Sequence, residues 1–169
     1  MDADMTFASP AAPSFRDAMR LVAGGVSVVT AGEGEERTGL TVTSTVSLSM
    51  EPPAMIICVN RRASALPTIV RLRHFCVNVL SAEQEAVANR FAGVGGVMGA
   101  ARYEGAEWRP LVTGALALEG ALASIDCKVE DIVERFSHAI VIGAVVAVTA
   151  RSGEPIIYSQ GRYRRIERG

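Results

Sequence analysis

Residues 39–50 read GLTVTSTVSLSM, and from Thr41 to Ser49 every second side chain carries a hydroxyl group. The positions between these hydroxyls are apolar except for Ser44. Because side chains alternate across an extended strand, this period of two predicts one β-strand with an apolar face and an uncharged polar face, ended by the prolines at 52–53. The polar face suits a flat ligand with polar edges, but Thr and Ser more often simply fill the solvent face of a strand, and the pattern alone favours that interpretation.

The composition limits the class of protein. The chain has 169 residues, of which 49% are hydrophobic and 21% are charged, so it is long enough and apolar enough for one domain with a core. The net charge of −1 and the lack of a Lys/Arg block argue against nucleic acid as a partner. No apolar run reaches the roughly 20 residues that span a bilayer, so a membrane partner is not expected. We expect residues 1–13 to form a flexible tail and residues 14–169 to form a single domain.

The chain contains three cysteines, Cys58, Cys76 and Cys127, which are widely separated and odd in number. This pattern predicts buried, reduced thiols rather than disulfides or metal ligands. Reduced thiols are typical of a cytoplasmic protein, and a cytoplasmic location is therefore expected.

The remaining patterns predict a mainly β protein. Three short helices are expected, together with a mobile glycine-rich loop over 93–106. The expected helices cover residues 14–23, 63–71 and 81–91, and the expected strands cover 26–30, 41–49, 54–59, 74–80, 115–119, 121–133, 140–149, 156–158 and 162–166. Because strands and helices do not alternate regularly, the order favours one closed or nearly closed antiparallel Greek-key barrel with peripheral helices.

Several common signatures of catalysis are incomplete in this sequence. Residues 93–99 (GVGGVMG) resemble a dinucleotide-binding fingerprint, but the spacing fails at Met98 and the run follows a predicted helix instead of a strand. The only two histidines, His74 and His138, have no second metal ligand at a suitable spacing, so a zinc site is not expected. A phosphate-binding P-loop and the G-x-S-x-G turn of serine hydrolases are also absent from the sequence.

A series of short segments is similar, in order, to the short-chain flavin reductases. These are the small components that supply reduced flavin to two-component aromatic monooxygenases. The matching segments are 15–19 (FRDAM), 25–30 (GVSVVT), 39–53 (GLTVTSTVSLSMEPP), 58–64 (CVNRRAS), 75–81 (FCVNVLS), 89–93 (NRFAG), 138–145 (HAIVIGAV), 155–158 (PIIY) and 161–163 (GRY). The resemblance implies an FMN-binding split β-barrel, a homodimer, FAD or FMN as the flavin, and NADH or NADPH as the reductant. It also implies a partner monooxygenase.

The resemblance also implies which residues bind each ligand. The flavin ring and its ribityl chain would lie along Thr41, Val42, Thr43, Ser44, Thr45, Ser47 and Leu48. The flavin phosphate would meet Arg62, Ala63 and Ser64, the turn at Phe91 and Ala92 would close over the flavin, and His138 with Tyr163 would contact the nicotinamide. Short hydroxyls and backbone groups can match the polar edge of the flavin ring without a fixed charge, and a cation at a helix start is a suitable anion site. Because backbone groups would do much of the binding, single Ser or Thr substitutions are expected to be mild.

The implied activity is NAD(P)H:flavin oxidoreductase, with hydride transfer to flavin N5. Alignment of the two ligands and exclusion of water would suffice for this reaction, and no side chain is expected to act as a general acid or base.

Two positions depart from the family pattern. Phe136-Ser137 stands where the family usually has Gly-Asp before the histidine, and Ala144 stands where it often has Glu. The first departure removes the carboxylate that could orient the imidazole of His138. This departure leaves open a flavin-binding or storage protein that is not an enzyme. A second alternative, on a related barrel, is an enzyme similar to the pyridoxamine-phosphate oxidases. The second would require more basic residues in its motifs than the sequence offers.

Overall fold

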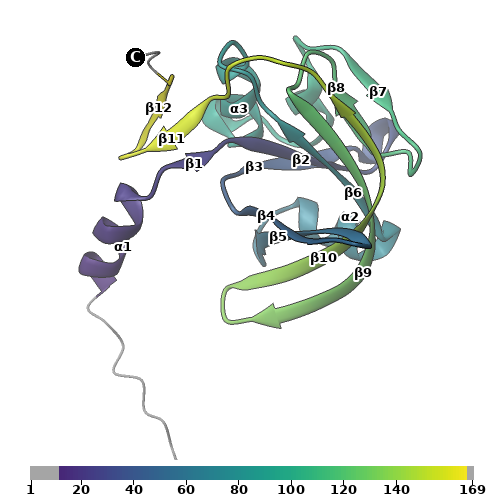
Figure 1. The fold of residues 1–169 in the computed structure, drawn as a ribbon, viewed down its shortest axis with the longest axis horizontal. Helices are drawn as coiled ribbons and strands as arrows, with labels where there is room; N and C mark the ends of the chain where they lie inside the picture. The colour runs from purple at the N-terminus through teal and green to yellow at the C-terminus, as the bar shows by residue number, and fades with distance from the viewer. Residues whose placement is uncertain (1–11, 167–169) are drawn as a thin grey trace, which may run out of the picture.

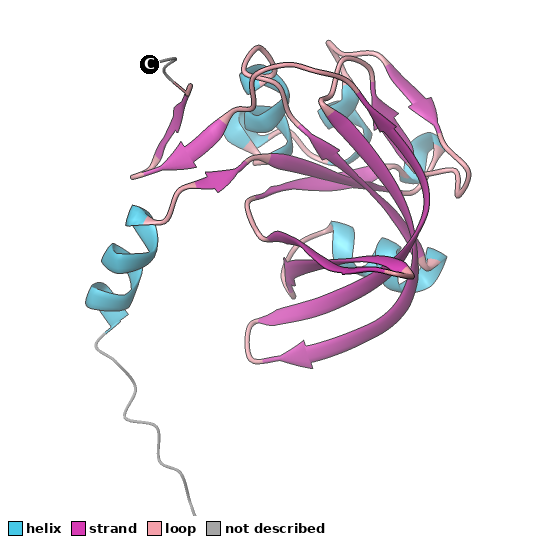
Figure 2. Ribbon diagram, in the orientation of Figure 1, coloured by secondary structure: helices cyan, strands magenta, loops and turns pink. Residues whose placement is uncertain are grey.

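The computed structural model describes residues 12–166 and has the mainly β architecture that the sequence predicts (Figures 1 and 2). The predicted tail, residues 1–13, lies outside the described residues except for Ala12 and Pro13, which begin the first helix. Among the described helices, none is long and apolar enough to cross a membrane.

The central sheet has seven strands, in the spatial order β3-β2-β6-β9-β10-β5-β4, and every neighbouring pair is antiparallel. These strands are β2 (Ser27–Ala31), β3 (Thr38–Val42), β4 (Thr45–Met50), β5 (Pro53–Asn60), β6 (His74–Val79), β9 (Ala123–Arg135) and β10 (His138–Ala150). The sheet curves strongly, as Figure 1 shows, so that its edge strands β3 and β4 face the same opening. Its edges are not joined by ladder hydrogen bonds within the described residues. The antiparallel barrel is therefore split, and the expected fold class is confirmed.

The prediction of one continuous strand over 41–49 is wrong. The chain leaves its partner β2 after Val42, bends at Thr43 and Ser44, and pairs with β5 from Thr45 onward. Ser44 fixes this change of partner, because its hydroxyl donates to the carbonyl of Cys58 at 3.0 Å and its own carbonyl accepts from the Cys58 amide at 3.3 Å. Residues 39–50, the hydroxyl motif, thus form both edges of the sheet and the crossing between them.

Helices and two small sheets surround the barrel. The helices are α1 (Ala12–Leu21), α2 (Ala65–Leu72) and α3 (Glu85–Phe91), with single 3₁₀ turns η1 (Gly34–Glu36), η2 (Val94–Gly96) and η3 (Gly99–Tyr103). One small sheet contains β1 (Gly24–Gly25), β11 (Ile157–Ser159) and β12 (Arg162–Arg164), and the other contains β7 (Trp108–Pro110) and β8 (Leu116–Leu118). Figure 1 shows α1 standing away from the barrel.

Three local predictions differ from the structure. The segment 93–106 contains two 3₁₀ turns, and Tyr103 is buried there with its hydroxyl donating to the carbonyl of Thr38 at 2.6 Å. Helix α3 begins at Glu85 rather than beside Ser81, which instead forms an isolated bridge to Pro155. The continuous apolar run over 54–59 predicts a strand buried on both faces, but in β5 only Ile57 and Val59 are buried, because β4 and β10 cover its edges while one face stays partly open.

The core has two main parts. One lies inside the curved sheet under α2 and includes Val29, Ile57, Ile69 and Phe75. The other lies beneath α3, where Phe91, Tyr103 and Trp108 pack with ring centroids 4.8–5.4 Å apart. This aromatic group holds α3 against β3 and so fixes the position of the residues at the end of β3.

The three cysteines have free thiols. Cys76 and Cys127 are buried as predicted, whereas Cys58 is partly exposed because it lies on the open face of β5.

Candidate functional site

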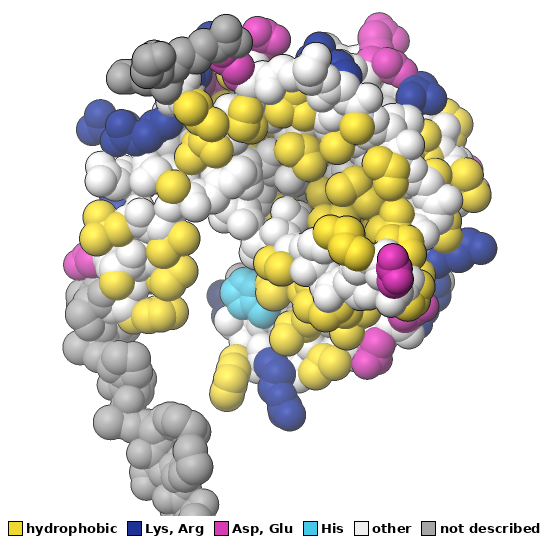
Figure 3. Space-filling model, in the orientation of Figure 1, with side chains coloured by type: hydrophobic (Ala, Val, Ile, Leu, Met, Phe, Trp, Pro, Cys, Tyr) yellow, Lys and Arg dark blue, Asp and Glu magenta, His cyan; other side chains and the backbone are white. Residues whose placement is uncertain are grey.

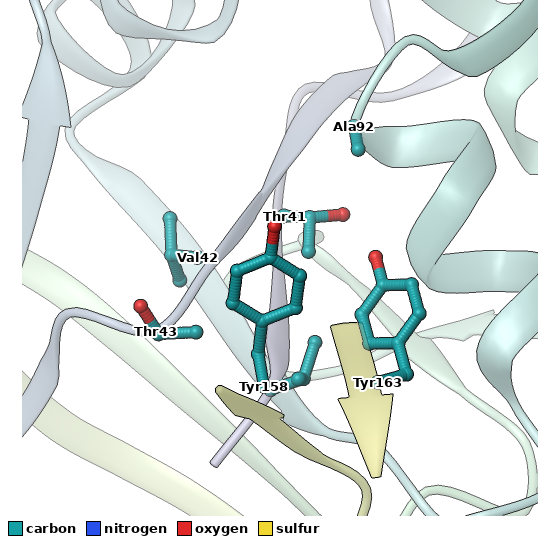
Figure 4. Close-up of a pocket in the computed structure, with 7 residues that line it drawn as sticks. Thr41, Val42, Thr43, Ala92, Tyr158 and Tyr163 are labelled. Carbon is teal, nitrogen blue, oxygen red and sulfur yellow. The ribbon is translucent and has the colours of Figure 1, made fainter. Parts of the chain in front are cut away.

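A cavity of about 240 Å³ opens where β3 ends (Figure 4). It is lined by Val26, Thr41, Val42, Thr43, Ala92, Tyr158 and Tyr163. Five of these residues are among the predicted site residues, and they come from β3 and the bend that follows it, the end of α3, and β12. The lining side chains carry no formal charge, which suits the uncharged ring of a flavin better than a strongly ionic ligand.

Local contacts hold the walls of this cavity in place. The hydroxyl of Thr41 donates to the carbonyl of Ala88 at 2.6 Å and so ties β3 to α3. Thr43 follows at the bend, is exposed, and makes no side-chain hydrogen bond within residues 12–166. The hydroxyl of Thr41 therefore stabilises the fold, while that of Thr43 is available to a ligand.

Two tyrosines form the wall opposite β3. Tyr158 and Tyr163 face each other across β11 and β12, with ring centroids 5.4 Å apart at an angle of 64°. Figure 4 shows both phenol oxygens pointing towards the side of the cavity formed by Thr41 and Ala92. Burial, followed by the nearby Tyr158 and Glu85, raises the pKa of Tyr163 above its usual value. Tyr163 thus stays protonated at neutral pH and can donate a hydrogen bond into the cavity.

The side chain of Phe91 does not line this cavity. It is 2% exposed and packs in the aromatic group with Tyr103 and Trp108. A contact from this turn to a ligand would have to come from Ala92, which is exposed and does line the cavity.

The predicted residues on β4 are not gathered into the same cavity. Thr45 pairs with Ile57 of β5 and has a free hydroxyl among the described residues, whereas Leu48 is 49% exposed at a bulge between Ser47 and Ser49. Ser47 lines a separate, mainly apolar hollow with residues of β9 and β10. The change of strand partner at Thr43 and Ser44 accounts for this division, since β3 and β4 follow different directions.

A second, larger cavity of about 580 Å³ lies at the far end of β5. It is lined by Asn60, Arg61, Arg62, Phe136 and Ser137. The Asn60 side-chain oxygen accepts from the Arg62 amide at 2.9 Å, and the Arg61 amide donates to the carbonyl of Ser137 at 2.9 Å. These bonds shape the turn that carries Arg62, whose guanidinium has no partner among the described residues and remains available to an anion.

The turn continues into α2 through the other two residues of the predicted phosphate site. Ala63 is half-buried against the core, and Ser64 is exposed at the start of α2. Ser64 makes no capping hydrogen bond to the helix, so its hydroxyl is free to bind a ligand. Because Cys58 is bonded to Ser44 and Asn60 follows two residues later on β5, one strand connects the bend in the hydroxyl motif to this phosphate-like site.

His138 begins β10 and lies opposite Asn60 in the register of β5. Its ring is exposed, and Nδ1 lies 2.9 Å from the hydroxyl of Ser137. A serine hydroxyl thus takes the place where the family pattern would supply a carboxylate. The imidazole keeps a hydrogen-bonding partner, although a neutral one.

Val26 and Tyr158 line the first cavity and Asn60 and Arg61 line the second, although no sequence pattern predicts a site role for them. Tyr158 ends the PIIY segment, and Asn60 and Arg61 lie within CVNRRAS, so the motifs contained them without assigning them a role. Val26 carries no such signal, because a buried valine at a strand start is ordinary core.

Comparison with known proteins gives a consistent family. Residues 19–167 match the model of the flavin reductase like domain. The chain is 40% identical to FMN reductase (NADH) RutF 2 of Methylorubrum extorquens, over 93% of this chain and 91% of that protein. The FMN reductase (NADH) RutF of Enterobacter cloacae is 36% identical over 83% of this chain and 84% of its own length.

Solved structures agree with this relationship. The NADH:FAD oxidoreductase SgcE6 of Streptomyces globisporus superimposes with a TM-score of 0.85 at 30% identity, covering 99% of this chain and all of that one. BorF, the flavin reductase component of a bacterial two-component tryptophan halogenase, gives a TM-score of 0.85 at 27% identity, covering 94% of this chain and all of that one. With its split barrel and its match over residues 19–167, the chain belongs to the flavin reductase-like domain family.

Proposed function

We propose that the protein is an NADH-dependent flavin reductase that uses FMN, with FAD as a second flavin. The observation that supports this most strongly is the uncharged cavity at the end of β3, which gathers Thr41, Val42, Thr43, Ala92 and Tyr163. The relatives named FMN reductase (NADH) support the choice of FMN and NADH, and the NADH:FAD oxidoreductase neighbour supports FAD as the alternative. NADPH in place of NADH is not favoured by any of these names.

The residues of this chain would act by binding and alignment. The backbone around Thr43 and the free hydroxyl of Thr45 would hold the edge of the flavin ring, and Arg62 with Ser64 would bind its phosphate. His138 would orient the nicotinamide. When bound, flavin accepts a hydride from the reduced nicotinamide, so the protein needs no acid or base of its own.

We also propose that the reduced flavin serves a separate monooxygenase. Two neighbours support this: BorF belongs to a two-component halogenase, and another is named nitrilotriacetate monooxygenase component B. The partner that this chain serves, and whether its substrate is aromatic, would be tested by reconstituting NADH-dependent oxygenation with candidate oxygenase components.

A homodimer is part of the same proposal. Helix α1 presents the apolar side chains of Phe15 and Met19, which are 60% and 48% exposed, and Val22 just after the helix is 59% exposed. Figure 3 shows hydrophobic side chains along this helix beside a hollow. Covering this face with a second copy would bury it. Light scattering after gel filtration should give a mass about twice the 17.9 kDa of one chain. The Met19→Asp variant should give the mass of a single chain. A monomeric wild type would contradict the proposal.

The activity itself is tested by following NADH oxidation at 340 nm with purified protein and added FMN. A flavin-dependent loss of absorbance is expected. Arg62→Ala should raise KM for FMN about tenfold but leave KM for riboflavin unchanged, because a charge-assisted bond to the phosphate is lost. Arg71→Ala is the matched control, since Arg71 is exposed and paired with Glu36. Stoichiometric flavin that NADH cannot reduce would instead support the flavin-binding or storage function.

A further inference from the structure

The loop between β9 and β10 holds an aromatic residue in an unfavourable setting. Arg135 and His138 are paired across the hairpin, and Phe136 and Ser137 form its two-residue loop. Phe136 has a φ of +49°, in the left-handed region that favours glycine. Its side chain is 94% exposed. A bulky residue in this conformation is a genuine outlier, and such positions are typical of functional sites.

Neither the turn nor the core explains Phe136. Glycine is the usual residue at the first position of a two-residue hairpin loop with positive φ, so phenylalanine weakens the turn. At 94% exposure its ring gains almost no burial in return. The residue therefore strains the turn and gains nothing from burial in exchange, which points to a contact with something outside the described chain.

The surroundings of Phe136 indicate the chemistry of that contact. Phe136 lines the 580 Å³ cavity together with two arginines and Asn60. Arg61 donates from Nη1 to the carbonyl of Phe136 at 3.4 Å and forms an exposed ion pair with Glu134 at 3.0 Å, while the guanidinium of Arg62 is without a partner among the described residues. An exposed ion pair of this kind is worth little, so a diphosphate can compete for Arg61. Arginines beside an unburied aromatic ring are the groups that bind a nucleoside phosphate, by charge-assisted bonds and by stacking.

We propose that this cavity is a subsite for the ADP moiety of a dinucleotide, with the adenine stacked on Phe136 and the diphosphate at Arg61 and Arg62. The proposal rests on the proposed function and deepens it. The ADP moiety can come from FAD, or from NADH, whose diphosphate would then lie at Arg61 because Arg62 holds the phosphate of the flavin. In FAD, the phosphate shared with FMN would stay at Arg62, and the second phosphate and adenine would extend towards Arg61 and Phe136.

The first test measures ADP binding by titration calorimetry with the full chain. Wild type should bind ADP, and F136G should raise Kd at least fivefold because a stacking contact is lost. F136G should also raise Tm by about 2–4 °C, because glycine relieves the left-handed backbone. F136W should retain the affinity of the wild type, since indole is an equally good stacking surface.

The matched control is Q160G. Gln160 has a φ of +54° in the two-residue loop between β11 and β12, so glycine relieves the same kind of strain there without touching the proposed subsite. It should raise Tm without changing Kd for ADP. Equal Kd values for F136G and wild type, or no binding of ADP to wild type, would overturn the proposal and leave Phe136 as an anchor for a protein partner.

A second measurement separates the two sources of the ADP moiety. If it comes from FAD, F136G should abolish any advantage of FAD over FMN in KM. If it comes from NADH, F136G should raise KM for NADH but not for reduced nicotinamide mononucleotide. Binding of ADP through Phe136 without any flavin reduction would contradict the proposed function alone, whereas FMN reduction without ADP binding would contradict this subsite alone.

Discussion

The hydroxyl of Ser137 lies 2.9 Å from Nδ1 of His138, at the start of β10. A hydroxyl can donate to or accept from the imidazole, so it can hold the ring in position without adding the negative charge of a carboxylate. If His138 contacts the nicotinamide, Ser137 orients that contact.

Removing this hydroxyl should therefore weaken the binding of NADH. Ser137→Ala should raise KM for NADH about two- to fivefold with little change in kcat, because an exposed hydrogen bond contributes about 0.5–1 kcal/mol. Ser137→Thr keeps a hydroxyl and should behave as wild type. Steady-state kinetics in a His138→Ala background is the control: there Ser137→Ala should have no further effect on KM. An equal effect in both backgrounds would show that Ser137 acts without the histidine.

Two neighbouring threonines should separate stability from ligand binding. Thr41→Val removes the 2.6 Å bond to Ala88 and should lower the free energy of unfolding by about 1 kcal/mol. Thr43→Val removes a hydroxyl with no partner among the described residues, so the free energy should change by less than about 0.5 kcal/mol. It should instead weaken flavin binding a few-fold, as measured by quenching of flavin fluorescence. A loss of stability in Thr43→Val would contradict the assignment of its hydroxyl to the ligand.

The glycine that opens the hydroxyl motif is fixed by packing. A Cβ at Gly39 would lie 2.5 Å from the carbonyl oxygen of Val29 and 2.6 Å from the ring of Phe91. Gly39→Ala should therefore destabilise the protein by about 3 kcal/mol, because neither the strand nor the buried ring can move easily. At Gly25 an added Cβ meets nothing within 4 Å, so Gly25→Ala should be nearly neutral. Urea unfolding followed by the fluorescence of the single tryptophan, Trp108, compares the two variants, and similar midpoints would contradict the packing.

Stability should fall in alkaline solution because of two buried thiols. Burial, with the charge of Asp126, raises the pKa of Cys127 to about 12 and shifts the pKa of Cys76 upward in the same way. Unfolded thiols ionise near pH 8.5, so above that pH the unfolded state releases protons that the folded state keeps, and unfolding becomes easier as pH rises. The free energy of unfolding should be about 1–3 kcal/mol lower at pH 9.5 than at pH 7.5. Cys127→Ala should reduce this difference by about half, and an unchanged difference would contradict the role of Cys127.

Some parts of this fold are readable from local pattern, and others depend on distant partners. The apolar runs at 26–30 and 74–80 predict the bounds of β2 and β6 to within one residue, because both strands are buried along almost their whole length. The same kind of pattern does not predict the break at Thr43 and Ser44. The break depends on the hydrogen bond from Ser44 to Cys58 of β5, and an alternation within one strand carries no information about that distant partner.

The candidate site shows the same contrast. The motifs named Thr41, Thr43 and Ala92 for one ligand, and the structure brings these residues into one cavity. The motifs also named Phe91, but its ring is buried against Tyr103. Tyr103 lies in the glycine-rich segment 93–106, for which the sequence predicts a loop with no fixed packing partner. Pairing between distant segments, which single-sequence patterns do not encode, decided each of these differences.

The most direct test fills the cavity at the end of β3. Ala92 lines it and Ala86 is exposed elsewhere on α3, so Ala92→Leu and Ala86→Leu form a matched pair with similar expected stability. Each protein is mixed with one equivalent of FMN in the absence of oxygen. One equivalent of NADH is then added, and the loss of flavin absorbance near 450 nm is followed over time. Wild type and Ala86→Leu should bleach with one equivalent of NADH, while Ala92→Leu should bleach at least tenfold more slowly. Equal rates in all three proteins, or no bleaching in wild type, would contradict a flavin site in this cavity.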